Sequence, residues 1–206
     1  MIGSHNSLTY LPVRQWYLKP FGWMARCQSK PILDQFANYN IRLFDFRVRF
    51  KNGEPIIAHG PFEFKSGKDC TILEFLFWVN EAAKSFNTPA YVRLILESNK
   101  KMKDQDKQEL CFQEFCEYCI HKDPNITFFG GNRKYDWKVV YEFNVINPIL
   151  IDKYSSTTNI FGGKKDSWTA KLDDFWPWLY AKLYNKKNYA EHTGRDVLFI
   201  DFVNIK

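Results

Sequence analysis

The segment Ala90–Glu97, which reads Ala-Tyr-Val-Arg-Leu-Ile-Leu-Glu, narrows the possible folds of this chain more than any other. Its apolar residues follow one another almost without a break. A strand of this kind is buried on both faces, which requires covering helices on each side of a sheet. The segment therefore predicts a largely parallel sheet within a mixed α/β fold.

Helical and extended segments alternate along the rest of the chain. In Ile41–Phe50 the polar residues Asp45, Arg47 and Arg49 alternate with apolar ones, so this expected strand has a distinct polar face. The Asn52-Gly53 pair that follows is typical of a tight hairpin turn. The strands we expect are Met1–Ser7, Ile41–Phe50, Glu54–His59, Ala90–Glu97, Ile126–Phe129, Pro148–Ile151 and Val197–Val203. The helices are Pro31–Tyr39, Thr71–Phe86 with a capping box, Asp104–His121 and Leu172–Lys186, interrupted by Pro177.

About seven strands alternating with helices favour a closed or nearly closed β/α barrel. A chain of 206 residues is short for that architecture. We therefore expect a compact, incomplete or distorted (β/α)8 TIM barrel in which some helices are short or missing. The sequence has no linker of low complexity and no fixed-period repeat, so residues 1–206 are expected to form a single domain.

The net charge of +6 and the aromatic content of 18% are compatible with nucleic acid, a membrane surface or a carbohydrate-like ligand. No run approaches the ~20 apolar residues that span a bilayer, and the first residues lack a signal-peptide pattern. We therefore expect a soluble, cytoplasmic protein. The five cysteines, an odd number, indicate reduced thiols. Cys111, Cys116 and Cys119 fit the buried face of a helix better than a metal or redox cluster.

Polar side chains recur at or near the ends of the expected strands. In a β/α barrel, side chains at the carboxyl ends of strands face the active site. Any one of these residues alone is explained as a hydrogen-bonded polar group at a strand end, but together they favour a site. The set comprises His5, Asp45, Arg47, His59, Glu97, Asp152 and Asp201.

Two histidines and an arginine suit the cleavage of a phosphodiester. One histidine takes a proton from an attacking hydroxyl, and the other gives a proton to the leaving oxygen. A guanidinium matches the phosphate oxygens and stabilises the charge that develops on them. A carboxylate hydrogen-bonded to the first histidine fixes its tautomer.

Three motifs, in this order, resemble the X-domain of phosphatidylinositol-specific phospholipase C, most of all its bacterial, metal-independent type. They are Gly3-Ser4-His5-Asn6-Ser7, Leu43-Phe44-Asp45-Phe46-Arg47-Val48-Arg49 and Ile57-Ala58-His59-Gly60-Pro61. The likeness continues through the helix Leu73–Phe86 and the strand Tyr91–Glu97. It resumes at Leu150-Ile151-Asp152-Lys153-Tyr154 and at Ile200-Asp201-Phe202-Val203-Asn204.

The resemblance implies a barrel that cleaves the glycerol–phosphate bond of an inositol phospholipid, giving diacylglycerol and a cyclic or open inositol phosphate. It implies that His5 is the general base, oriented by Asp201, and that His59 is the general acid. Arg47, held by Asp45, would stabilise the phosphate. Substrate contacts would come from Asn6, Glu97, the inositol-binding candidate Arg133, Asp152 at an inositol hydroxyl and Tyr154 stacked on the ring.

The resemblance also bears on metal dependence. Calcium-dependent members of this family bind the ion through four positions, of which Asn6, Asp45 and Glu97 match three. The fourth position is held by Arg47, whose positive charge would repel a cation. Because calcium prefers several oxygen ligands, we expect no cofactor and regard calcium as disfavoured. Glu97 stands where bacterial members have a lysine.

The aromatic segment Trp16–Trp23 contains Lys19 and suits an anionic membrane surface. We expect Trp16 and Trp23 to contact the membrane, with the filling of gaps in a compact barrel as an equal alternative. Trp176 and Trp178 are expected in the core. The resemblance implies an anionic inositol phospholipid at a membrane surface as the partner, and we expect a monomer that associates peripherally with that membrane.

Four alternatives compete with this prediction. One is a calcium-assisted phospholipase C. Another is a phosphodiesterase with a metal held by a Glu-x-Asp pair, from which Asp45-Phe46-Arg47 departs. A third is a lipid-binding barrel without turnover, which the complete catalytic set disfavours. The last is a nucleic-acid binder, which we do not expect because the basic residues are dispersed and form no known motif.

Overall fold

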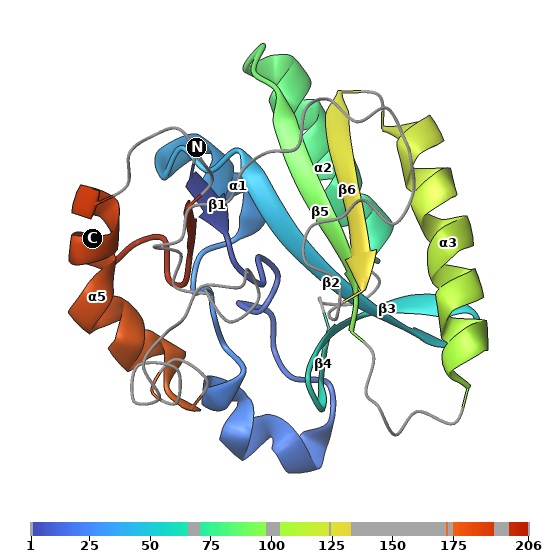
Figure 1. Cartoon of the computed structure of the whole chain (residues 1–206), viewed down its shortest axis with the longest axis horizontal. Coiled ribbons are helices and arrows are strands. Elements are labelled where there is room, and N and C mark those ends of the chain that lie inside the picture. Colours follow the sequence, from blue (N-terminus) through green and yellow to red (C-terminus); the bar gives the residue numbers. More distant parts are fainter. Residues whose placement is uncertain are drawn as a thin grey trace.

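The computed structural model describes residues 2–65, 71–97, 104–123, 125–132, 172, 175–191 and 198–205. These residues form the expected mixed α/β fold, in which the strands join one strongly curled sheet (Figure 1). The strands are β1 (Ile2–Ser4), β2 (Leu43–Lys51), β3 (Glu54–His59), β4 (Phe62–Phe64), β5 (Ala90–Leu96), β6 (Ile126–Asn132) and β7 (Leu198–Ile200). The helices are η1 (Trp16–Met24, a 3₁₀ helix), α1 (Ile32–Asn38), α2 (Ile72–Ser85), α3 (Gln105–Lys122) and α5 (Pro177–Glu191).

The centre of the sheet is parallel, with the strand order β7-β1-β2-β5-β6. β2 is longer than its neighbour β1, which covers only the start of one β2 edge, at Leu43 and Phe44. The far end of β2, from Val48 to Lys51, pairs with β3, which runs antiparallel and pairs in turn with β4. The last strand therefore lies beside the first, as in a barrel, while a hairpin replaces one β/α unit.

The expectation of a closed or nearly closed barrel is wrong, because the described strands form an open half-barrel. The Asn52-Gly53 turn explains part of the difference. Both residues have positive φ, 55° and 84°, which is the geometry of a tight hairpin. This turn folds the chain directly back onto β2, whereas a parallel neighbour requires a long helical crossover. β4, which the sequence did not predict, follows a second turn at Gly60, whose φ is 56°, and pairs antiparallel with β3.

Most other predicted elements are confirmed to within a few residues. At the start of α2 the Glu74 carboxylate accepts the Thr71 backbone N–H at 2.7 Å, in the expected capping box. The expected interruption at Pro177 is confirmed: Leu172 and Phe175 are helical, the chain leaves the helix at Trp176, and α5 begins at Pro177, where proline is tolerated in the first helical turn. The expected strand Pro148–Ile151 lies outside the described residues.

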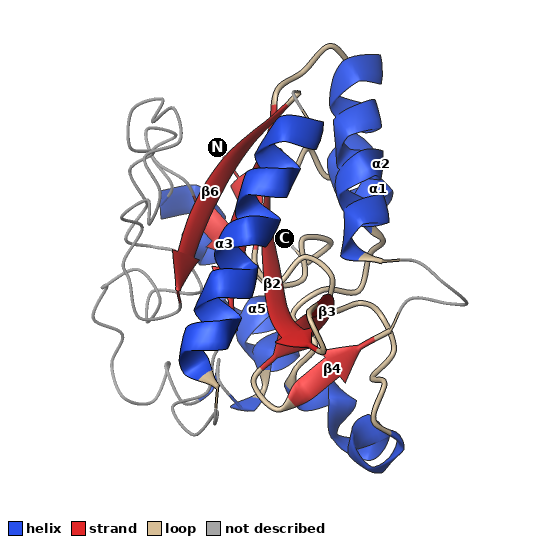
Figure 2. Cartoon of the chain, turned by 90° about the vertical axis from the view of Figure 1, so that its right-hand side faces the viewer, coloured by secondary structure: helices blue, strands red, loops and turns tan. Residues whose placement is uncertain are grey.

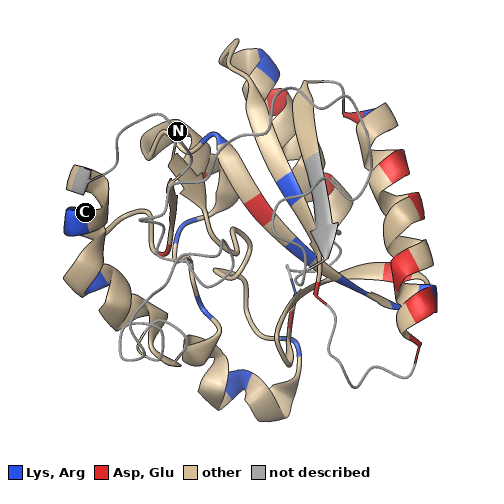
Figure 3. Cartoon of the chain, in the orientation of Figure 1, with Lys and Arg blue, Asp and Glu red and all other residues tan. Residues whose placement is uncertain are grey.

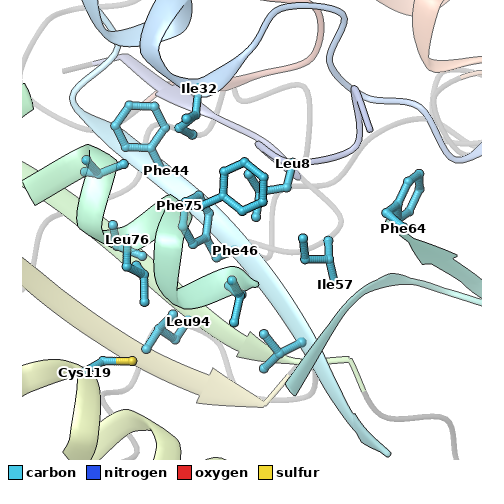
Figure 4. Packing of buried hydrophobic residues seen from close by; sticks show 14 of the residues in the cluster. Leu8, Ile32, Phe44, Phe46, Ile57, Phe64, Phe75, Leu76, Leu94 and Cys119 are labelled. Atoms are coloured by element: carbon cyan, nitrogen blue, oxygen red, sulfur yellow. The ribbon is translucent and has the colours of Figure 1, made fainter. Parts of the chain in front are cut away.

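The hydrophobic core lies between the sheet and the helices α1, α2 and α3 (Figures 2 and 4). Phe44 stacks on Phe36 of α1, with ring centroids 6.2 Å apart, and Phe50 meets Phe115 of α3. Because side chains alternate across a strand, Asp45 and the arginines of β2 point to the opposite, concave face. The predicted polar face of this strand is therefore the interior of the half-barrel.

Two further predictions concern the helices. Cys116 and Cys119 are buried free thiols of α3, and burial raises the pKa of each, as expected for small core residues. Of the helices in the described part of the chain, none is long and apolar enough to cross a membrane.

Candidate active site

His5 and Asp201 meet because the first and last strands are parallel neighbours. Ser4, the last residue of β1, pairs with Ile200, the last residue of β7. The His5 backbone N–H continues the ladder by donating to the Ile200 carbonyl at 3.0 Å. His5 and Asp201, the residues that directly follow the two strands, therefore lie at the same end of the sheet.

The hydrogen bonds around the His5 ring define its tautomer. Nδ1 lies 2.6 Å from Oδ1 of Asp201, and Nε2 lies 2.7 Å from Nη2 of Arg47. A guanidinium can only donate, so Nε2 must accept and Nδ1 must carry the proton that is donated to Asp201. In this tautomer His5 has its basic lone pair on Nε2, as a general base requires.

Arg47 lies between two buried carboxylates. Its Nε and Nη2 donate to Oδ2 of Asp45 at 3.2 and 3.0 Å, and Nη1 lies 3.5 Å from Oε2 of Glu97. Burial alone would lower the pKa of Arg47, but the charges of Asp45 and Glu97 outweigh it and raise that pKa. Burial would raise the pKa of Asp45, but Arg47, Arg93 and His5 together hold it below its usual value. Both groups of the Asp45–Arg47 pair are therefore charged at neutral pH.

Asn6 joins His5 to this ion pair. Its backbone has a φ of 45°, a left-handed conformation that asparagine tolerates better than most residues. The turn directs the Asn6 backbone N–H to Oδ2 of Asp45 at 3.2 Å and its side-chain Nδ2 to Nε2 of His5 at 3.1 Å. Asn6 thus helps to fix the position of the His5 ring.

His59 approaches His5 from the other side of the site, at the end of β3. The two rings lie 6.2 Å apart between centroids and are inclined by 76°. Nδ1 of His59 donates to the Ala25 carbonyl at 3.0 Å, which makes Nε2 the ring atom suited to exchange a proton with substrate. His59 is half-buried, whereas the His5 residue is only 7% exposed.

Glu97 and Arg49 hold the turn that follows His59. Oε1 of Glu97 accepts the Gly60 backbone N–H at 2.9 Å. Arg49 donates to the Gly60 carbonyl through Nη2 and to the Glu97 carbonyl at 3.3 Å through Nε. The polar face of β2 thus supports both histidines, Arg47 at His5 and Arg49 behind His59.

The structure brings together seven of the predicted site residues: His5, Asn6, Asp45, Arg47, His59, Glu97 and Asp201. Arg133, Asp152 and Tyr154 lie outside the described residues. Sequence reasoning did not place Cys27 or Gln28 in the site, because it considered the chain around Trp23 only as a membrane contact. Arg49 was recognised only as part of the polar face of Ile41–Phe50. The alternation of polar and apolar residues in that strand was the signal that could have assigned it to the site.

Arg47 occupies the position where a calcium ion would have to bind. Its guanidinium contacts both Asp45 and Glu97, the two carboxylates of the implied ligand set. A second possible metal group combines His5, Cys27 and Asp201, whose ligand atoms lie within 4.8 Å of one another. The same donors are already used there, since His5 holds Asp201 through Nδ1 and Arg47 through Nε2. The residues present therefore fit a metal poorly.

The aromatic residues near η1 are mostly exposed. Trp16 is 79% exposed and Trp23 is 43% exposed, which leaves both able to contact a partner. Trp176 and Trp178 are each 42% exposed, so the expectation that they lie in the core is wrong. Trp176 packs against the ring of Trp23 at the surface, with centroids 5.8 Å apart. Two segments far apart in the sequence thus share one aromatic surface.

Comparison of the chain with models of protein families, with curated proteins and with solved structures gave no match.

Proposed function

We propose that this protein is a metal-independent phosphodiesterase that cleaves the glycerol–phosphate bond of phosphatidylinositol-type lipids at a membrane surface. The observation that carries the proposal is a pair of neighbouring histidines whose rings are held by different groups on opposite sides of the site. His5 is held by Asp201 and Arg47, and the His59 ring lies 6.2 Å from it. This arrangement offers one base, one acid and one fixed positive charge, which are the groups that phosphodiester cleavage needs.

In the proposed reaction the inositol 2-hydroxyl attacks phosphorus. His5 takes the hydroxyl proton on Nε2 while a new P–O bond forms. His59, in its protonated form, gives a proton to the glycerol oxygen as the old P–O bond breaks. The products are diacylglycerol and a cyclic inositol phosphate, and water opens the cycle by the reverse use of the same two groups.

Arg47 would have two roles in this scheme, at Nε2 of His5 before substrate binds and at the phosphate afterwards. Its Nη2 contacts Nε2 of His5, the atom that accepts the proton. A substrate phosphate would attract this guanidinium, because charge-assisted hydrogen bonds to phosphate are strong. Asp45 holds the guanidinium from behind through Nε and Nη2, so Arg47 supplies the positive charge that a metal supplies in other phosphodiesterases.

The charge distribution supports an approach to an anionic surface from one side. Acidic residues outnumber lysines on α3, whereas α5, on the other side of the molecule, carries three lysines, and η1 carries Lys19 (Figure 3). The second side also carries the exposed aromatic surface of Trp16, Trp23 and Trp176. Basic and aromatic residues together are typical of proteins that bind the membrane interface.

A cleavage assay on mixed vesicles tests the proposal. Vesicles of phosphatidylcholine with phosphatidylinositol, phosphatidylserine or phosphatidylglycerol are incubated with the protein in the presence and absence of EDTA. We expect inositol phosphate to be released only from phosphatidylinositol and at the same rate with EDTA. Activity that needs added calcium would overturn the metal-independent part.

The histidine variants identify the source of the activity. His5→Ala and His59→Ala should each abolish release, while His121→Ala, on the exposed end of α3, should leave it unchanged. If the folded wild-type protein binds these vesicles but releases no product, the chain is a lipid-binding protein and the proposed reaction is wrong.

A further inference from the structure

Gln28 is a fully buried amide whose side chain uses both of its ends. Nε2 donates to the His5 carbonyl at 3.1 Å and to the Ile200 carbonyl at 2.8 Å. Oε1 accepts the Val203 backbone N–H at 3.1 Å. Because a buried amide is costly unless its polar atoms are satisfied, these three bonds give Gln28 one well-defined orientation.

The partners of Gln28 flank the two residues that form the base. One bond reaches the main chain of His5 itself, and the other two reach Ile200 and Val203, on either side of Asp201. The ladder between β1 and β7 is only three residue pairs long and stops before His5 and Asp201. Gln28 therefore bridges the two strands at the point where their own pairing ends.

The neighbouring backbone strengthens this bridge. The Cys27 carbonyl accepts the Phe202 N–H at 2.6 Å, and Phe202 has a φ of 48°, so the chain turns sharply just after Asp201. Thr9 fixes the other side, because its hydroxyl oxygen accepts the backbone N–H groups of Cys27 and Gln28 at 2.9 and 3.2 Å. The bridge thus belongs to a rigid segment.

We propose that Gln28 is a positioning residue for the His5–Asp201 pair. This inference rests on the proposed function, in which His5 is the general base. By fixing the main chain on both sides of Asp201, the Gln28 amide sets the 2.6 Å contact between Oδ1 of Asp201 and Nδ1 of His5. Gln28 touches no reacting atom, so its loss is expected to slow the chemical step and to leave substrate binding unchanged.

The test compares Gln28→Met, which keeps the length of the side chain but removes its three bonds, with Gln108→Met. Gln108 is a matched control because its amide also bridges to backbone, at Phe50, with bonds of 2.8 and 2.6 Å remote from the histidines. The substrate is a short-chain phosphatidylinositol below its micelle concentration. The second readout is the low-field proton NMR signal of the His5 Nδ1–H group, assigned by its absence in His5→Ala.

We expect Gln28→Met to lower kcat by about tenfold to a hundredfold with KM unchanged, since small misplacements of catalytic groups have effects of this size. The low-field proton should shift or disappear in Gln28→Met and persist in Gln108→Met. If Gln28→Met keeps both the wild-type kcat and the proton signal, or loses no more kcat than Gln108→Met, the inference is overturned.

A second variant, Gln28→Glu, keeps the inference testable if Gln28→Met does not fold. Gln28→Glu keeps the volume and the acceptor for Val203 but loses the donors to both carbonyls, and it should lose the same proton signal. If neither variant folds while Gln108→Met does, Gln28 is a residue of the fold and the positioning role is wrong. If the wild-type protein does not cleave inositol lipids, the proposed function fails, whereas the proton signal still decides whether Gln28 positions His5.

Discussion

Nη2 of Arg47 lies 2.7 Å from Nε2 of His5, so the guanidinium donates to the ring atom that would take the substrate proton. A substrate must replace this contact before His5 acts as a base. A phosphodiester is suited to do so, because its phosphate draws the guanidinium away while its neighbouring hydroxyl takes over the lone pair. In the proposed reaction, binding of the phosphate and exposure of Nε2 of His5 would therefore be coupled in one step.

Replacing Asp201 with asparagine should disable His5 while leaving the fold intact. An asparagine amide can present its NH2 group to Nδ1, which favours the wrong tautomer and moves the proton to Nε2. We expect kcat for phosphatidylinositol cleavage to fall by about two to four orders of magnitude, with KM little changed. Asp123→Asn, at a buried carboxylate at the end of α3, should keep wild-type kcat. Equal loss in both variants would contradict a specific role for Asp201.

Replacing Arg47 with methionine should destabilise the protein. The change leaves Asp45 and Glu97, 0% and 1% exposed, without their common partner. Removing one member of a buried ion pair typically costs about 3–5 kcal/mol of unfolding free energy. Urea denaturation of Arg47→Met, of Asp45→Asn and of the double variant Arg47→Met/Asp45→Asn measures this. The double variant should recover part of the loss, and strict additivity would show that the two residues do not interact.

Local signals in the sequence were sufficient for most of the fold. The Asn52-Gly53 turn, the capping box of Thr71 and Glu74 and the apolar run of β5 each reflect interactions between residues close in the chain or the burial of one segment. Closure of the sheet is different, because it depends on how the far edges β6 and β7 relate in space. The number of strands and their alternation with helices do not show whether these two edges meet. The prediction of a closed or nearly closed barrel was wrong for this reason.

The candidate site shows the same division. His5, Arg47 and Asp201 were found because titratable residues at strand ends are visible in the sequence. Gln28 was not, because an uncharged amide that bonds to the backbone of remote segments leaves no periodic or chemical pattern. Trp176 was misassigned because an aromatic residue before a helix fits burial and exposure equally well, and only the packed surface separates the two.

Trp16 should contribute to vesicle binding and not to chemistry. It is the most exposed of the large hydrophobic side chains in the described part of the chain, at 79%. Transfer of such a ring into the interface is worth about 1.4 kcal/mol or more, so Trp16→Ala should weaken binding to phosphatidylinositol vesicles about tenfold. Cleavage of a monomeric short-chain substrate should not change. Phe77→Ala, at an aromatic residue 50% exposed on α2, should keep full vesicle affinity, and an equal loss there would contradict a localised membrane surface.

The buried Asp45 predicts a loss of stability in acid. Burial favours its neutral form, but the charge of Arg47, with Arg93 and His5, outweighs burial and lowers the pKa of Asp45 in the folded protein. The unfolded chain, with a pKa of about 3.9, then binds a proton at a higher pH than the folded one does. The stabilisation from Asp45 is therefore complete above the unfolded pKa and is lost as the pH falls through the folded pKa.

Urea denaturation from neutral pH down to about pH 3 checks this contribution, because the range includes the unfolded pKa of about 3.9. Asp45→Asn should be less stable than wild type at neutral pH, since Arg47 loses the nearer of its two carboxylates. The free energy of unfolding of this variant should also fall less steeply in acid, because the titrating carboxylate is gone. Asp106→Asn, exposed on α3, serves as the control and should keep the wild-type slope. An Asp45→Asn slope equal to that of wild type would mean that other carboxylates dominate acid unfolding and that the Asp45–Arg47 pair is not its main cause.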